Sequence, residues 1–255
     1  MGELVSIERQ GAVATLLLDA PPLNPFDTAM REALAAAVRE IDADPTVRAV
    51  VLTGGEKVFA AGADIQALLA MDFVDIVDWN ARLQRTFTAV AELPVPVVAA
   101  INGYALGGGL ELALCADYRV AGERAALGLP EVTLGIMPGS GGTQRLTEIV
   151  GRSRAKELIM TGRRLKAVEA LELGIVDEVV PGSSTGRAHE LAARLAAGPR
   201  HAIQAIKQAV DQAGGAHEAG LALERSLIAG LFATPDRRTG MQSFVTDGPG
   251  RARFE

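Results

Sequence analysis

The sequence predicts an α/β protein, and three observations lead to this fold class. The apolar runs Val47–Leu52 and Val95–Ile101 show no polar alternation, which is typical of strands buried on both faces of a sheet. Other segments have apolar residues at helical spacing, as amphipathic helices do. Glycine- and proline-containing turns separate the two kinds of segment. Strands and helices that alternate in this way are the signature of the α/β class.

Most of the predicted strands lie in the first half of the chain. Val13–Leu18 is a short apolar run that ends at a proline-containing loop, and it predicts the first strand. Asp27 is positioned to cap a helix from about Thr28 to Asp42. The small residues of Phe59–Asp64 predict a loop. The other elements expected here are helices over 65–71, 77–93 and 110–115, and a strand over 118–121.

The second half of the chain is predicted to be mainly helical. Helices are expected at Ser153–Met160 and Ala167–Leu173, followed by a strand at Ile175–Val180. The stretch Pro181–Gly186 reads as a linker, which divides the chain into an α/β core over 1–186 and a helical region over 187–255. The helical pattern continues to about Thr234, and an irregular, polar end is expected beyond it.

Charge and cysteine content narrow the function classes. The chain of 255 residues carries a formal net charge of -6, which disfavours an extended nucleic-acid surface. Its single cysteine, Cys115, cannot form an internal disulfide, so a reducing compartment is the simpler interpretation. No signal pattern opens the chain, and Val95–Ile101 is too short to span a bilayer. We expect a cytoplasmic protein without nucleic-acid or membrane partners.

Two acids stand out as candidates for proton transfer. Glu111 follows three glycines in an otherwise apolar stretch, and the surroundings of Glu131 are equally poor in charge. A carboxyl group in such a setting is partly buried, and burial raises its pKa into a range useful for catalysis. From the residues alone, the alternative is that each acid is a surface residue or pairs with a buried arginine.

The glycines at 107–109 suggest a second element of chemistry. Glycines before a helix leave backbone N–H groups exposed, and these suit an oxyanion hole that stabilises charge on a carbonyl oxygen. A tight turn with close strand–helix packing explains the same glycines. Dinucleotide, P-loop and nucleophile-elbow motifs are incomplete, and His189, His201 and His217 lack metal-like spacing. We therefore expect no metal site and no cofactor, and we interpret Cys115 as a core residue.

Three segments together resemble the crotonase superfamily, also called the enoyl-CoA hydratase/isomerase family. They are Phe59–Ile65, Asn102–Ala113, and Pro130–Val132 followed by Pro138–Leu146, and their order and separation also fit. The resemblance implies a spiral of ββα units that carries the active site, with a helical C-terminal region that forms trimers or hexamers. It also implies an acyl-CoA thioester as substrate.

The same resemblance implies a role for each matching residue. Glu111 and Glu131 match the two catalytic acids, and the backbone amides of Ala63 and Gly108 match the oxyanion hole. Further contacts to substrate or CoA are implied at six positions, which are Ala61, Asp64, Ile65, Gln66, Gly139 and Phe244. Gln66 and Asp247 stand where the family commonly has lysine, which leaves Lys57, Arg251 and Arg253 as candidates to contact the CoA phosphates.

An intact pair of acids favours enoyl-CoA hydration, the addition of water across a 2-enoyl thioester. An enoyl-CoA isomerase, or a hydratase of a branched acyl-CoA, is the nearest alternative. A non-catalytic acyl-CoA-binding or RNA-binding relative is a third, which the acidic balance disfavours. An NAD-dependent enzyme is the fourth, and the incomplete glycine fingerprint disfavours it.

Overall fold

The computed structural model of this chain describes residues 3–213, 215, 217–248 and 251–254. It confirms the α/β class. The strands are β1 (Val5–Gln10), β2 (Val13–Leu18), β3 (Ala49–Thr53), β4 (Val97–Ile101), β5 (Tyr104–Leu106), β6 (Tyr118–Gly122), β7 (Ala126–Gly128), β8 (Leu165–Lys166) and β9 (Glu178–Val180). The helices are α1 (Thr28–Ala43), α2 (Ile65–Leu69), α3 (Phe73–Ala91), α4 (Gly108–Ala113), the 3-10 helix η1 (Glu131–Leu134), α5 (Gly142–Thr161), α6 (Ala167–Glu172), α7 (Thr185–Ala196), α8 (Arg200–Asp211), α9 (His217–Leu231) and α10 (Pro235–Asp247).

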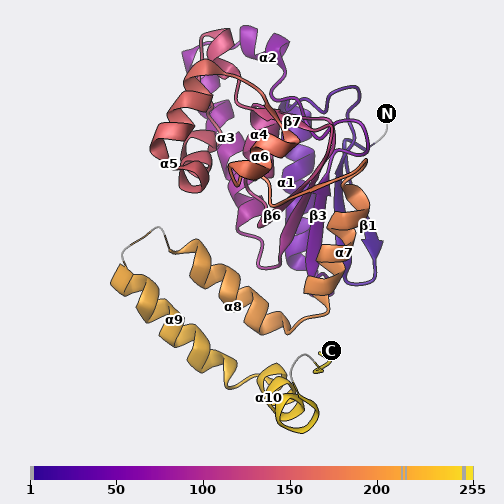
Figure 1. Cartoon of the computed structure of the whole chain (residues 1–255). Helices are drawn as coiled ribbons and strands as arrows, with labels where there is room; N and C mark the ends of the chain where they lie inside the picture. The colour runs from indigo at the N-terminus through magenta and orange to yellow at the C-terminus, as the bar shows by residue number, and fades with distance from the viewer. Residues whose placement is uncertain (1–2, 214, 216, 249–250, 255) are drawn as a thin grey trace.

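The main sheet has the strand order β1-β2-β3-β4-β6-β9, and a smaller sheet has the order β5-β7-β8. In the main sheet only β1 and β2 pair antiparallel, while the other neighbours are parallel. Figure 1 shows α1 and α3 on one side of this sheet and α7 against the other. The chain thus builds a sheet covered on both faces, as the unbroken apolar strands predict.

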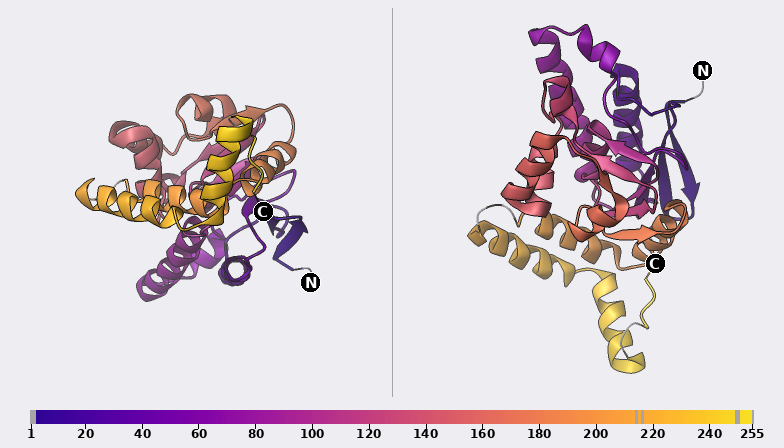
Figure 2. Two further views of the ribbon diagram at one scale, coloured as in Figure 1. Left: turned by 90° about the horizontal axis from the view of Figure 1, so that it is seen from below. Right: turned by 45° about the horizontal axis from the view of Figure 1, so that its top comes forward.

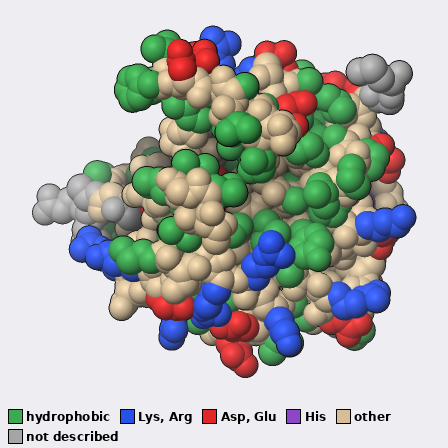
Figure 3. Space-filling model, turned by 90° about the horizontal axis from the view of Figure 1, so that it is seen from above, with side chains coloured by type: hydrophobic (Ala, Val, Ile, Leu, Met, Phe, Trp, Pro, Cys, Tyr) green, Lys and Arg blue, Asp and Glu red, His purple; other side chains and the backbone are tan. Residues whose placement is uncertain are grey.

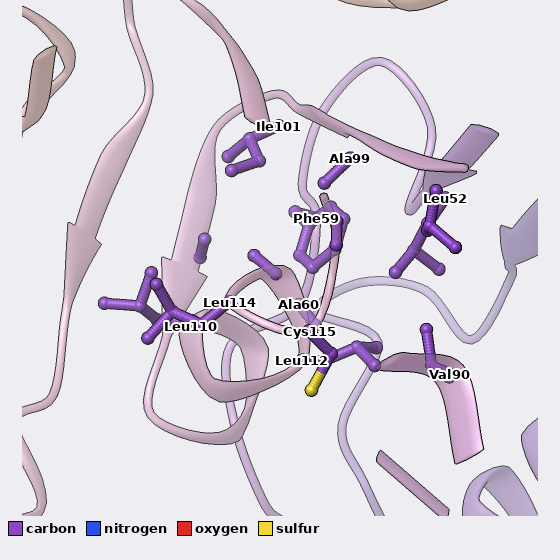
Figure 4. Packing of buried hydrophobic residues seen from close by; sticks show 14 of the residues in the cluster. Leu52, Phe59, Ala60, Val90, Ala99, Ile101, Leu110, Leu112, Leu114 and Cys115 are labelled. Atoms are coloured by element: carbon purple, nitrogen blue, oxygen red, sulfur yellow. The ribbon is translucent and has the colours of Figure 1, made fainter. Parts of the chain in front are cut away.

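Alternate residues of the central strands serve two different cores. Val50 and Leu52 of β3 belong to the larger core, which contains side chains of α1 and α3. Ala49 and Val51, their neighbours in sequence, pack in a second core with α7. Figure 4 shows part of the larger core, where side chains of β3, β4 and α4 surround Phe59. The large core anchors the loop after Phe59, which reaches the candidate site.

The last helices leave the body of the protein. Figures 1 and 2 show α8 running below the sheet and α9 and α10 extending beyond it. These helices and the turn after α9 leave exposed apolar side chains, namely Ile206, Val210, Leu221, Ile228, Phe232, Met241, Phe244 and Val245.

Two predicted boundaries in the second half are wrong. The helix expected at Ser153–Met160 begins eleven positions earlier, at Gly142, with a non-helical kink at Gly151. Glycines at 141, 142 and 151 hid the start of this helix, because glycine is a poor helix former. The end beyond Thr234 is not irregular, since α10 starts at Pro235 with Thr234 as its cap.

Gly109 is the point at which α4 touches the strand-like segment before the candidate site. A Cβ atom at this position would lie 2.0 Å from the carbonyl oxygen of Ala60. No side chain of an L-residue fits there without a shift of the backbone. Gly186, in the exposed first turn of α7, has no atom within 4 Å of its ideal Cβ position.

We expect Gly109→Ala to lower the free energy of unfolding by roughly 1–3 kcal/mol or more, because α4 must move away from Ala60. Gly186→Ala is the matched control, and its added methyl group is expected to raise stability by up to about 1 kcal/mol. Urea denaturation of both variants measures the difference. Equal stability of the two variants would contradict the close packing at Gly109.

Candidate active site

A cavity of about 740 Å³ lies between α3, α4, η1 and the loops at residues 61–63 and 136–140. Figure 3 looks onto this end of the molecule, where apolar side chains gather around a hollow. The residues that line the cavity are Ala61, Gly62, Ala63, Ile65, Leu68, Met71, Asp72, Phe73, Ile76, Val77, Trp79, Asn80, Leu83, Gly107, Gly108, Glu111, Pro130, Glu131, Leu134, Ile136, Met137, Gly139 and Ser140. Most of these side chains are apolar, and the acidic ones are Asp72, which caps α3, and the two glutamates.

Glu111 lies in the first turn of α4 and is 3% exposed. Its Oε1 accepts hydrogen bonds from the backbone N–H groups of Ser140, at 2.7 Å, and Gly142, at 2.8 Å. Gly142 begins α5, and a Cβ atom there would lie 3.0 Å from the Glu111 side chain. The turn before α5 therefore packs directly on the carboxyl group and supplies it with donors.

Burial raises the pKa of Glu111 above its ordinary value. The hydrogen bonds from Gly142 and Ser140 and the positive charge of Arg145 act in the opposite direction, because they stabilise the ionised form. No ion pair involves Glu111 or Glu131 in the described residues. The alternative of a carboxylate paired with a buried arginine is thus excluded for both.

Glu131 is the first residue of η1, and its carboxyl group meets the same cavity. Burial, followed by the charge of Glu111, raises the pKa of Glu131 to about 7. Its Oε2 is buried and has no hydrogen-bond partner within the described part of the chain. A Cβ atom on Gly107 would lie 3.2 Å from its Oε1, so the carboxyl group lies against the turn before α4.

The two acids therefore form a pair that resists full ionisation. Glu111 is buried and Glu131 is half-buried, and the charge of Glu111 raises the pKa of Glu131. Such a pair holds a proton near neutral pH and can both give and accept one. The two acids, which stand in apolar stretches distant in sequence, thus meet in one cavity.

Ala63 and Gly108 both line the cavity. The segment before Ala63 runs parallel to β5 through the Ala60–Ala105 bridge, and Gly62 then packs against the turn at Gly107. Phe26 bonds the peptide groups on both sides of Ala63, donating to the Gly62 carbonyl and accepting from the Asp64 N–H. Neither the Ala63 nor the Gly108 N–H donates to an acceptor in the described residues. Two amides are thus available to a carbonyl oxygen.

Only some of the other predicted contact residues line this cavity. Ala61, Ile65 and Gly139 line it. The Asp64 carboxylate instead caps α2 by accepting from the N–H groups of Gln66 and Ala67, and the Gln66 side chain is exposed. Phe244 lies 62% exposed on α10 and is not among the lining residues of this chain.

Sequence reasoning missed several residues that shape the site. The amide side chains of Asn80 and Gln84, on α3, both donate to the Gly139 carbonyl oxygen, at 2.9 and 2.6 Å. Polar residues four positions apart within an apolar helix were the only signal for them. Cys115 is buried as expected, and burial raises the pKa of its thiol to about 12, which leaves it unreactive as a nucleophile.

Within the described residues, each helix is too short or too polar to span a bilayer. The same residues contain no group of three His, Cys, Asp or Glu side chains that could hold a metal ion.

Comparison with known proteins places this site in a family. The family model for enoyl-CoA hydratase/isomerase matches residues 8–250. A probable enoyl-CoA hydratase of Rhizobium meliloti is 42% identical over 95% of both chains. A short-chain-enoyl-CoA hydratase of Clostridium acetobutylicum is 38% identical over 94% of both.

Solved structures give the same result. The crystal structure of an enoyl-CoA hydratase from Bacillus anthracis superposes with a TM-score of 0.91, at 39% identity over 96% of both chains. This similarity confirms the expected crotonase fold. With a full-length match in sequence and in structure, the chain belongs to the enoyl-CoA hydratase/isomerase family.

Proposed function

We propose that this protein is an enoyl-CoA hydratase, which adds water reversibly across the 2,3 double bond of a 2-enoyl-CoA. The observation that carries the proposal is that Glu111 and Glu131 share a cavity with the Ala63 and Gly108 amides, which donate to no acceptor among the described residues. A hydratase needs a group to accept a proton from water, a group to donate one, and donors for the thioester oxygen. All three requirements meet in one cavity of apolar lining, which suits an acyl chain.

The proposed reaction begins with the thioester carbonyl oxygen on the Ala63 and Gly108 amides. As water attacks the β-carbon, one acid takes a proton from it and the other gives a proton to the α-carbon. Negative charge that develops on the thioester oxygen is stabilised by the two amides. We assign the ionised role to Glu111, because two backbone donors stabilise its carboxylate, and the protonated role to Glu131. The reaction as written consumes no cofactor.

The CoA part of the substrate is proposed to lie along Ala61–Gln66, of which Ala61 and Ile65 line the cavity. The proposed setting is acyl-CoA metabolism in the cytoplasm, for which the bacterial relatives are the support.

We expect Glu111→Gln and Glu131→Gln each to lower kcat for hydration at least about a hundredfold, because each removes one proton-transfer group. Loss of enoyl absorbance with crotonyl-CoA and with a longer 2-enoyl-CoA measures the rate. Glu172→Gln, which changes an exposed acid on α6, is the control and should match wild type. If the wild-type protein leaves all 2-enoyl-CoA substrates unchanged but shifts the double bond of a 3-enoyl-CoA, the hydratase proposal is wrong and the protein is an isomerase.

The raised pKa of Glu131 predicts a pH dependence of stability. Its ordinary value of 4.5 applies to the unfolded chain, so between about pH 4.5 and 7 the folded protein binds more protons than the unfolded one. The Glu131 contribution to stability therefore falls as the pH rises through this window. We expect the free energy of unfolding of Glu131→Gln, relative to wild type, to increase from pH 5 to pH 8. Urea denaturation at several pH values tests this, and a constant difference would mean that Glu131 titrates normally.

We also propose that the chain assembles as a trimer or a hexamer through the C-terminal helices. The support is the row of exposed apolar side chains on α8, α9 and α10. Sedimentation at micromolar concentration is expected to give three or six times the mass of one chain. A monomer would contradict the assembly.

A further inference from the structure

The peptide group between Gly139 and Ser140 connects helix α3 to the candidate catalytic acid. On one side, the Gly139 carbonyl oxygen accepts from the Asn80 Nδ2 and the Gln84 Nε2. On the other side, the Ser140 N–H donates to the Glu111 Oε1 at 2.7 Å. A single peptide group thus receives two donors from α3 and gives one donor to Glu111.

The planarity of the peptide bond makes this connection rigid. In a trans peptide group the C=O and the following N–H point in opposite directions within one plane. Fixing the direction of the Gly139 carbonyl therefore fixes the direction of the Ser140 N–H. Two donors on the carbonyl also polarise the peptide group, which strengthens the hydrogen bond that its N–H gives to a carboxylate.

A side chain at position 139 would displace the Asn80 amide from its present place. A Cβ atom on Gly139 would lie 2.7 Å from the Asn80 Oδ1 and 3.2 Å from the Asn80 Cγ. Asn80 and Gln84 are four positions apart, so both project from the same face of α3. The absence of a side chain at Gly139 allows this face of α3 to approach the turn closely enough for both hydrogen bonds.

Helix α3 also forms part of the cavity wall, through Ile76, Asn80 and Leu83. The helix that contacts a ligand in the cavity is therefore the helix that holds the turn before α5. Sequence separations of 59 and 55 residues between the partners make this a tertiary contact.

We propose that Asn80 and Gln84 are positioning residues for Glu111. They orient the Ser140 N–H so that the Glu111 carboxylate is held at a fixed position in the cavity, and they tie that position to α3. The proposal rests on the hydratase function for its kinetic consequence, while its structural part concerns the Ser140 hydrogen bond alone.

The kinetic test compares wild type with Asn80→Ala, Gln84→Ala and the double variant, using crotonyl-CoA. We expect the double variant to lose about tenfold to a hundredfold in kcat, because the acid is misplaced. KM is expected to change less than about threefold in Gln84→Ala, because Gln84 does not line the cavity. Gln84→Lys in the Asn80→Ala background should recover most of the loss, since an ammonium group also donates to a carbonyl. A larger change in KM than in kcat would overturn the positioning role.

A matched control is present on the same helix. Asp78 and Arg82 form an exposed pair four positions apart on α3, at 2.8 Å, and neither lines the cavity. The double variant Asp78→Ala/Arg82→Ala removes a comparable pair of side chains from α3. This control is expected to keep wild-type kcat. If its kcat falls as much as that of the Asn80/Gln84 double variant, the loss reflects a general disturbance of α3, and the positioning role is contradicted.

A second measurement separates this inference from the hydratase assignment. Amide hydrogen exchange at Ser140, followed by NMR, reports its hydrogen bond without any substrate. We expect exchange at least about tenfold faster in the Asn80/Gln84 double variant and unchanged exchange in the Asp78/Arg82 control. If wild type is inactive, the hydratase assignment fails, and the exchange result alone decides the positioning role. Unchanged Ser140 exchange in the double variant would overturn that role even in an active enzyme. If the double variant does not fold, exchange is measured in the single Gln84→Ala variant instead.

Discussion

A carboxylate that is shielded from water is stabilised by hydrogen-bond donors within the protein, and the two donors to Glu111 organise the site around it. The donors are backbone N–H groups of the turn before α5, so that turn must lie against α4. Close approach of backbone to carboxylate is possible because position 142 is glycine. The penalty for a buried, unpaired charge would otherwise amount to several kcal/mol. Glu111 thus fixes the relative positions of α4, α5 and the turn between η1 and α5.

The same reliance on backbone groups appears where the Gly62 loop meets the Gly107 turn. Gly107 has a φ of 53°, and the ideal Cβ position of Gly62 lies 3.6 Å from the Gly108 nitrogen. Gly62 and Gly107 both have a positive φ, which L side chains rarely adopt, so a side chain at either position would strain the contact between the two loops. Gly62 and Gly107 are therefore required by the shape of the backbone that lines the cavity. Gly109, in contrast, is required by close packing of α4 against Ala60. The two interpretations of the glycine cluster, a tight turn and the proposed oxyanion hole, are compatible with each other.

The sequence was informative where a single segment determines its own structure. Unbroken apolar strands such as Val95–Ile101 identify a covered sheet, and an acid in an apolar stretch, such as Glu111, identifies a buried carboxyl group. The roles of the matched residues came from resemblance, because no local pattern says which amides face a common cavity. The clamp of Asn80 and Gln84 on Gly139 could not be predicted, since it depends on how α3 packs against a turn more than fifty residues away. The early start of α5 was missed for a local reason, because its glycines oppose the helix that tertiary packing enforces.

The apolar lining of the cavity has two consequences that act together. It gives an acyl chain a surface to contact, and it raises the pKa values of Glu111 and Glu131 by removing water from around them. A bound acyl chain would exclude more water, and the lower effective dielectric constant would strengthen the attraction between the two amides and a negatively charged thioester oxygen. In the proposed reaction, the hydrogen bonds of Ser140 and Gly142 to Glu111 would strengthen for the same reason, which would favour the ionised form of that acid. Substrate binding and the proposed division of roles between the two acids would then both depend on the exclusion of water from this cavity.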